Sequence, residues 1–141
     1  MDDVFSRIFA SLGAGVPVLL LHFATTLVLL AAGVLLYMAV TPFRERQLIR
    51  EGNLAAGIMT FGIFLGVSIP LAATLATSAV WLDVVLWGAI AVVLQVATFL
   101  VATLILPGLR HLIEGGNTAA ALAMVGVQLA VALLNAGAMA G

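Results

Sequence analysis

The chain has 141 residues, of which 65% are hydrophobic and 8% are charged, and its mean hydropathy is +1.31. A water-soluble domain of this size could not cover its core with so little polar surface, so the composition predicts an integral membrane protein. The net charge is −1, all five basic residues are arginine and there is no cysteine. This argues against a nucleic-acid surface and excludes disulfides, thiolate metal sites and cysteine nucleophiles.

The first residues, 1–14, are expected to form a short amphipathic segment that lies in the membrane interface. Phe5, Ile8, Phe9 and Leu12 recur there at helical spacing, with polar residues between them. A cleaved signal peptide is the alternative. The chain begins with acidic residues, however, and the apolar run that follows is too long for such a peptide.

Four long apolar segments follow, each long enough to cross a hydrocarbon core of about 30 Å. They cover residues of about 16–40, 53–78, 83–106 and 117–139. Thr41-Pro42 and Pro107-Gly108 end the first and third segments, since proline disfavours helical geometry in the residue before it. The sequence therefore predicts an all-α fold, a four-helix bundle in the membrane.

A sequence of eight residues that begins at Ile49 returns 64 residues later, beginning at Ile113. Each half of the chain carries a helix, a proline stop, a charged segment, a capping asparagine and a second helix. An even number of helices in each half means that both insert in the same direction. We therefore expect two tandem parallel helical-hairpin repeats, 16–78 and 79–141, and self-association through the same faces is plausible.

The arginines predict the orientation. The two loops 41–52 and 107–116 together hold Arg44, Arg46, Arg50 and Arg110, against Arg7 alone on the other side. Because loops rich in basic residues stay inside, both loops are expected in the cytoplasm and both termini in the periplasm.

Landmarks along nearly the whole chain resemble the bacterial YjfL-like inner-membrane proteins, the domain of unknown function 350. They are Thr41-Pro42, Gln47-Leu48-Ile49, Asn53-Leu54-Ala55-Ala56, Ile69-Pro70-Leu71, Asp83, Trp87-Gly88, Gln95, Leu106-Pro107, Asn117-Thr118-Ala119-Ala120 and Asn135-Ala136. The resemblance implies a small four-helix inner-membrane protein with paired hairpins and no established catalytic residues. Members are often encoded beside membrane-stress proteins of the phage-shock type, which implies partners of that kind.

Two asparagines stand where the charged segments meet the next apolar runs. Asn53 and Asn117 are expected to cap helix N-termini, because an asparagine oxygen accepts from the free amides of the first turn. Together with Arg50 and Arg110 they could also form a weak anion site at two helix N-termini. Capping alone accounts for the residue type, so it is the favoured interpretation.

Five polar residues inside the spans form a candidate polar stripe: His22, Thr26, Gln95, Gln128 and Asn135. They could line a polar path or a small-ligand site. The favoured alternative is interhelical hydrogen bonding that holds the bundle together, for which amides and threonines are common. No carboxylate lies near the middle of a span, which weakens proton-coupled transport.

Small and helix-breaking residues mark the packing of the second span. Gly62 and Gly66 form a pair that lets another backbone come close, and Pro70 predicts a bend. Asp83 is expected to cap the start of the third span. His22 and His111 lie toward opposite faces, so we expect no metal site in one chain.

The sequence carries no nucleophile with a base, no phosphate loop and no paired carboxylates, so we expect neither an enzyme nor a bound cofactor. Two functions stay open. One is a non-catalytic oligomeric component that scaffolds or recruits partners, with a link to envelope stress. The other is a small ion channel or transporter formed by a homo-oligomer. A continuous wet path past the polar stripe would favour the channel, and amides bonded to one another in a dry interior would favour the scaffold.

Overall fold

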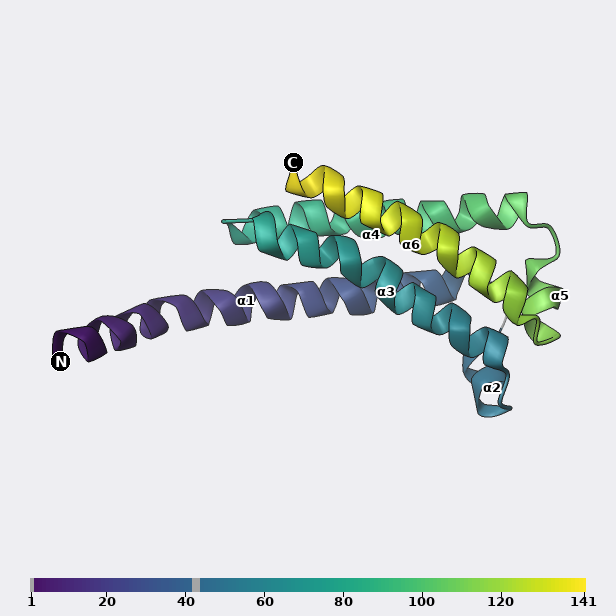
Figure 1. The fold of residues 1–141 in the computed structure, drawn as a ribbon, viewed down its shortest axis with the longest axis horizontal. Coiled ribbons are helices and arrows are strands. Elements are labelled where there is room, and N and C mark those ends of the chain that lie inside the picture. Colours follow the sequence, from purple (N-terminus) through teal and green to yellow (C-terminus); the bar gives the residue numbers. More distant parts are fainter. Residues whose placement is uncertain (1, 42–43) are drawn as a thin grey trace.

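The computed structural model describes residues 2–41 and 44–141, and this part of the chain is all-helical apart from short connections. The elements are α1 (Asp2–Val40), α2 (Glu45–Arg50), α3 (Leu54–Thr77), α4 (Trp81–Ile105), α5 (Leu109–Glu114) and α6 (Thr118–Ala140). Four of them, α1, α3, α4 and α6, are long and apolar enough to cross a membrane, which confirms the predicted all-α fold with four spans. The short helices α2 and α5 occupy the two charged segments (Figure 1).

The bounds of the last three spans follow from local signals. Helices α3, α4 and α6 begin and end within two residues of the predicted segments. Helices α3 and α6 each start directly after an asparagine whose Oδ1 atom accepts from the amide three residues later, at 3.0 Å. Pro107 follows the end of α4. The predicted stop at Pro42 lies outside the described residues, and α1 ends at Val40.

Helix α1 differs from the prediction at its start. A separate segment over 1–14 and a span over 16–40 were expected, but one helix of 39 residues runs through both and contains Pro17. The two expected segments are continuous in the structure, and Pro17 does not interrupt them, because a proline removes only one backbone bond and a long apolar helix tolerates it. The position of the first turns in the membrane interface stays a prediction.

The first half of α1 projects beyond the other helices, as Figure 1 shows. Every described side chain from Asp3 to Leu21 is exposed, and His22 is the first buried residue. At about 1.5 Å per residue, 39 residues extend over about 58 Å, well beyond a hydrocarbon core of about 30 Å. Only the second half of α1 therefore packs in the bundle.

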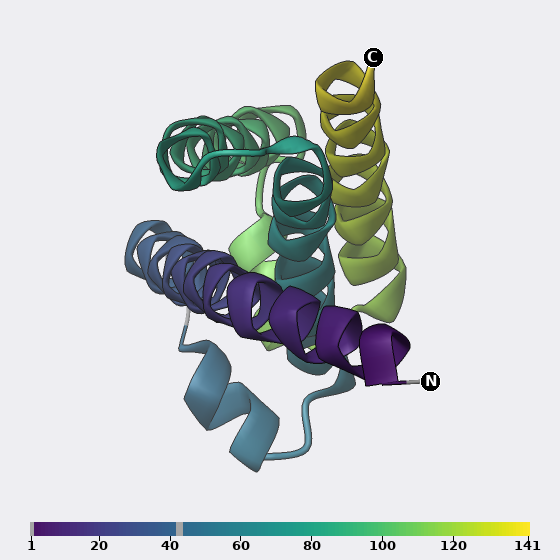
Figure 2. The same ribbon diagram turned by 90° about the vertical axis from the view of Figure 1, so that its left-hand side faces the viewer.

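Helix α3 lies in the middle of the bundle, among α1, α4 and α6 (Figure 2). Its most extensive contact is with α6, and α1 packs against both α3 and α4. We call the end with α2 and α5 the connector end, and the end at the α3–α4 turn, residues 78–80, the turn end. The main core lies toward the connector end and includes Tyr37, Met59, Ile63, Phe99 and Met124.

Glycines set the spacing of α3 from its neighbours. A Cβ atom at Gly62 would collide with the side chain of Val125 on α6. One at Gly66 would lie 2.8 Å from the Nε2 atom of Gln95 on α4. Both glycines of the predicted pair therefore allow close helix contact, which small residues provide inside membranes.

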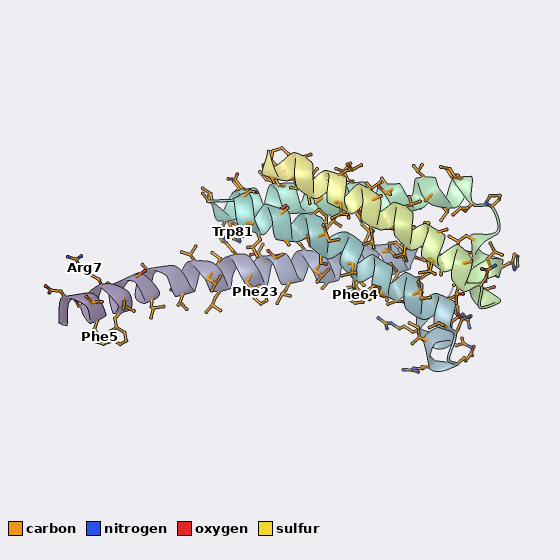
Figure 3. The ribbon with its side chains drawn as sticks, in the orientation of Figure 1. Phe5, Arg7, Phe23, Phe64 and Trp81 are labelled. Atoms are coloured by element: carbon orange, nitrogen blue, oxygen red, sulfur yellow. The ribbon has the colours of Figure 1, made fainter. Side chains whose placement is uncertain are left out.

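The outer surface of the bundle is apolar. Figure 3 shows Phe23 and Phe64 pointing away from the other helices, and they are 51% and 46% exposed. Near the N-terminus, Phe5 and Arg7 point to opposite sides of α1 (Figure 3). An exterior of this kind matches the lipid tails that surround a membrane helix.

Candidate functional site

Two buried glutamines join α4 to α6 near the middle of both helices. Gln95 is fully buried and Gln128 is 2% exposed. The Nε2 atom of Gln95 donates to the backbone oxygen and to the Oε1 atom of Gln128, both at 2.9 Å. The Nε2 atom of Gln128 lies 3.5 Å from the hydroxyl of Tyr37 on α1. These amides therefore connect three spans inside the core, with Gly66 of α3 making room for Gln95.

An aromatic contact closes the core on the connector side of the amides. The rings of Tyr37 and Phe99 have centroids 4.2 Å apart and are tilted by 45°. Tyr37 is 1% exposed and Phe99 is fully buried. The Tyr37 hydroxyl is thus the one polar end of a large apolar cluster, and it faces the amide of Gln128.

The structure brings together only two members of the predicted polar stripe, Gln95 and Gln128. His22 is buried on α1, fifteen residues before Tyr37, or about 22 Å along the helix. Thr26 donates to the His22 backbone oxygen at 2.8 Å within its own helix. Asn135 lies near the turn end, on the wall of a cavity between the ends of α3, α4 and α6. The residues of the predicted stripe therefore lie in three separate places. Inside the bundle, Gln95 and Gln128 are hydrogen-bonded to each other.

The two connectors end with the same backbone geometry, although they begin differently, since Gly108 before α5 has a positive φ and Arg44 before α2 does not. Each is a six-residue helix, α2 or α5, followed by a glycine with positive φ and a capping asparagine. Gly52 and Gly116 have φ of 81° and 78°, a left-handed backbone conformation that residues with a side chain rarely adopt. The backbone amide of Asn53 donates to the backbone oxygen of Leu48 at 2.9 Å, and the backbone amide of Asn117 donates to that of Leu112 at 2.8 Å. The repeated sequence thus forms a repeated local structure.

Asn53 also links the first connector to the second. Its Nδ2 atom donates to the backbone oxygens of Ile113 and Glu114 at 2.8 and 3.2 Å, while its Oδ1 atom caps α3. The Nε atom of Arg110 is paired with Glu114 at 2.8 Å. Two members of the candidate anion site are thus engaged in structural bonds, which favours capping over anion binding.

Sequence reasoning missed Glu45, a buried carboxyl on the first turn of α2. It is 4% exposed, and its Oε1 atom is buried without a hydrogen-bond partner among the described residues. Burial raises the pKa of Glu45 above its ordinary value of 4.5, and the Thr41 side chain and Arg46 oppose this rise. A signal was available, because Glu45 precedes the inward-facing Leu48 by three residues and so shares its helical face.

A cavity of about 420 Å³ lies at the turn end, between the ends of α3, α4 and α6. It is lined by Thr77, Ser78, Asp83, Trp87, Ile90, Leu94, Asn135, Ala138 and Met139. Asp83 was expected to cap the third span, but α4 begins at Trp81 with Val80 as N-cap. Asp83 is therefore free of a capping role and lies in the first turn, on the wall of the cavity. The sequence could not indicate that Asp83 and Asn135 share a site.

A second, almost wholly apolar groove of about 520 Å³ follows α4 and α6 toward the connector end. Small residues, Ala97, Ala102 and Ala123, form part of its lining, together with Leu94, Val101 and Val127. Leu94 belongs to both hollows, so the face between α4 and α6 is indented from the turn end to the connector end.

Four apolar spans and an amide pair inside the bundle define a multi-pass helical membrane protein. Residues 11–139 match the family described as Domain of Unknown Function (DUF350), and the chain belongs to this family. It is 36% identical over 104 residues to the UPF0719 inner membrane protein YjfL of Escherichia coli strain K12, which covers 74% of this chain and 79% of the relative. The protein of the same name from Escherichia coli O157:H7 matches equally. No solved structure matches the chain significantly.

Proposed function

We propose that the protein is a non-catalytic component of the bacterial inner membrane that forms homo-oligomers and recruits partner proteins at its connector end. The observation that carries the proposal is the bond from Gln95 to Gln128. Amides that line a conducting path face water, whereas these two donate and accept inside a packed core. They serve the bundle as interhelical bonds, which is a common use of glutamine in membranes.

The orientation in this proposal rests on the arginines. Arg44, Arg46, Arg50 and Arg110 are all exposed at the connector end, which supports a cytoplasmic position for that end. Both termini would then lie in the periplasm. A reporter fused to either terminus is expected to be active only outside the cytoplasm, and activity inside the cytoplasm at both ends would overturn the topology.

The proposed internal repeat pairs α1 with α4 and α3 with α6. Its support is the shared geometry of the connectors, where two glycines with φ near 80° precede two capping asparagines. The central contact between α3 and α6 would then lie on the pseudo-two-fold axis, along the membrane normal.

The proposed oligomer uses the apolar groove between α4 and α6. Alanines on both of its walls, Ala97 and Ala123, let a helix of a second copy approach closely. The chain has no cysteine, so single cysteines report cleanly on this contact. Ala123→Cys is expected to give disulfide-linked dimers on oxidation, whereas Phe61→Cys, which is exposed on α3 away from the groove, serves as the control. Equal cross-linking at both positions would contradict this interface.

The proposed recruiting surface is the exposed arginine side of α2, residues 44, 46 and 50. Unlike the side chain of Asn53, these arginine side chains do not hold the connectors together, and they present positive charge next to the membrane surface. An acidic protein segment is the partner whose charge fits, and a link to envelope stress follows from the family resemblance alone. A photo-cross-linker at Arg46 should capture such a partner, and one at the exposed Ser11 of α1 should not.

Ion flux through purified protein in liposomes decides between this proposal and a channel. We expect no selective flux from the native chain, from Gln128→Leu or from Asn135→Leu at matched incorporation, and lower stability from Gln128→Leu, which loses an interhelical bond. Selective flux in the native chain that both variants lose would overturn the scaffold function and establish a conducting one.

A further inference from the structure

The cavity at the turn end has a polar part and an apolar part. Asp83, Ser78 and Asn135 lie on its polar walls, and Trp87 and Leu94 continue it along α4. Its volume of about 420 Å³ lies within the range of about 300–1,000 Å³ that is usual for small-molecule sites. The cavity therefore fits an amphiphilic occupant.

Two polar residues that line the cavity lack a bonding partner among residues 2–41 and 44–141. The Nδ2 atom of Asn135 is buried without a hydrogen-bond acceptor. Asp83 forms no ion pair in this part of the chain. The ion pair found there joins Arg110 to Glu114. A buried donor without an acceptor is costly, and so is a carboxylate near lipid without a cation. One ligand that carries both an anionic oxygen and a cationic nitrogen would satisfy both groups.

The depth of the cavity corresponds to one leaflet. Asp83 and Leu94 are eleven residues apart on α4, which is about 16 Å along the axis. Half of a hydrocarbon core is about 15 Å. Trp81 lies two residues before Asp83 on α4 but faces α1, where its Nε1 atom donates to the hydroxyl of Thr25 at 2.8 Å, and tryptophan is typical of the headgroup level. The polar part thus lies at the headgroups and the apolar part reaches the middle of the bilayer.

We propose that this cavity binds a phospholipid with a primary-ammonium headgroup, phosphatidylethanolamine. The ammonium pairs with the carboxylate of Asp83, next to the ring of Trp87, which attracts cations. The Nδ2 atom of Asn135 is buried, so its side chain rotates to bring this atom into the cavity, where a phosphate oxygen accepts from it and from the hydroxyl of Ser78. The first part of one acyl chain passes Leu94. The site is independent of the proposed partner recruitment, because it lies at the opposite end of the bundle, and it meets the proposed oligomer groove at Leu94.

The test is lipid retention by the purified full-length protein, measured by native mass spectrometry after addition of phosphatidylethanolamine or phosphatidylglycerol. The native chain should retain phosphatidylethanolamine about tenfold better, since phosphatidylglycerol carries no cation for Asp83. Asp83→Asn, which keeps the shape of the side chain, should abolish this preference, and Asp83→Glu should keep part of it. Glu51→Gln at the exposed connector end removes the same charge and is the control.

Asn135→Leu separates the contribution of the buried amide, and it should lower retention of both lipids because each has a phosphate. Equal retention of both lipids by the native chain, or an unchanged preference in Asp83→Asn, would overturn the proposal. Soluble phosphoethanolamine should not compete at the concentrations at which the lipid binds. If it competes as well as the lipid, the assignment to a membrane lipid is wrong.

Discussion

The Nε2 atom of Gln95 lies 2.9 Å from two oxygens of Gln128, one on the backbone and one on the side chain. A single amide of α4 thus bonds α6 twice, near the middle of both helices. Because both side chains are buried in the core, the pair also fixes how far α4 can slide along α6. Its removal should therefore be measurable as lost stability.

Gln95→Leu is expected to lower the free energy of unfolding by about 0.6 to 1.7 kcal/mol, between the average and the maximum for interhelical hydrogen bonds in membranes. Gln128→Leu should cost a similar amount, and the double variant should cost less than the sum, because neither glutamine is then left without its partner. Unfolding in mixed micelles of increasing denaturing detergent gives these values as a double-mutant cycle. Additive losses would show that the two amides do not interact.

Gly62→Ala is expected to destabilise the bundle by about 1 to 3 kcal/mol, because the added methyl collides with Val125 and forces α3 and α6 apart. Gly57→Ala is the matched control on the same helix. A Cβ atom there meets nothing within 4 Å, so this variant should be neutral or stabilise by up to about 1 kcal/mol. Similar effects of both substitutions would mean that helix propensity, not packing, decides them.

Asn53→Ala should destabilise more than Asn117→Ala. Both variants lose an N-cap, worth about 1 kcal/mol, but the first also loses the bonds from Nδ2 to Ile113 and Glu114. Asn53→Asp keeps an oxygen that can cap α3 and removes the donor, so it isolates the link to α5. Thermal unfolding of the three variants in one detergent measures the differences, and equal losses for the two alanine variants would contradict the link.

The buried carboxyl of Glu45 should make the protein less stable as the pH rises. Burial raises its pKa in the folded state above the ordinary 4.5, so the folded chain binds this proton more tightly than the unfolded chain. Between the ordinary and the raised pKa, stability therefore falls with rising pH, and it stays at the lower level above that window. Glu45→Gln should remove this decline and be the more stable form at neutral pH.

Thermal unfolding from below the ordinary carboxyl pKa to neutral pH measures the effect of Glu45. Glu51→Gln is the control, because Glu51 lies exposed on the same connector and accepts from Gln47 at 2.8 Å. The same pH profile in the native chain and in Glu45→Gln would assign the decline to other groups.

The spans could be predicted because their limits depend on local residues. Asn53 and Asn117 act within one turn of their own position, and long apolar runs need no partner to be recognised. The same local reasoning separated residues 1–14 from the first span, because amphipathic spacing there changes to an apolar run, but one helix continues through both.

The candidate site depended on contacts that local patterns do not contain. Helical angles placed Gln128 and Asn135 on one face of α6, yet they lie about 10 Å apart along it and meet different neighbours. Which residue of α4 meets Gln128 depends on the relative height of the two helices, and Gly66 and Val125 fix that height through contacts between spans. Glu45 was missed because its burial comes from folding of the connector against the bundle.

The bond from Asn53 to α5 joins residues 60 positions apart in the sequence, and this separation determines when during synthesis the bond can form. When α1 and α3 enter the membrane, the ribosome has not yet produced the carbonyls that Asn53 will meet. The first hairpin can insert, but one of its donors stays unpaired until α4 has crossed back and α5 has formed. Completion of the first hairpin thus waits for the second, so a chain cut short after α4 lacks the bond that joins its first connector to α5.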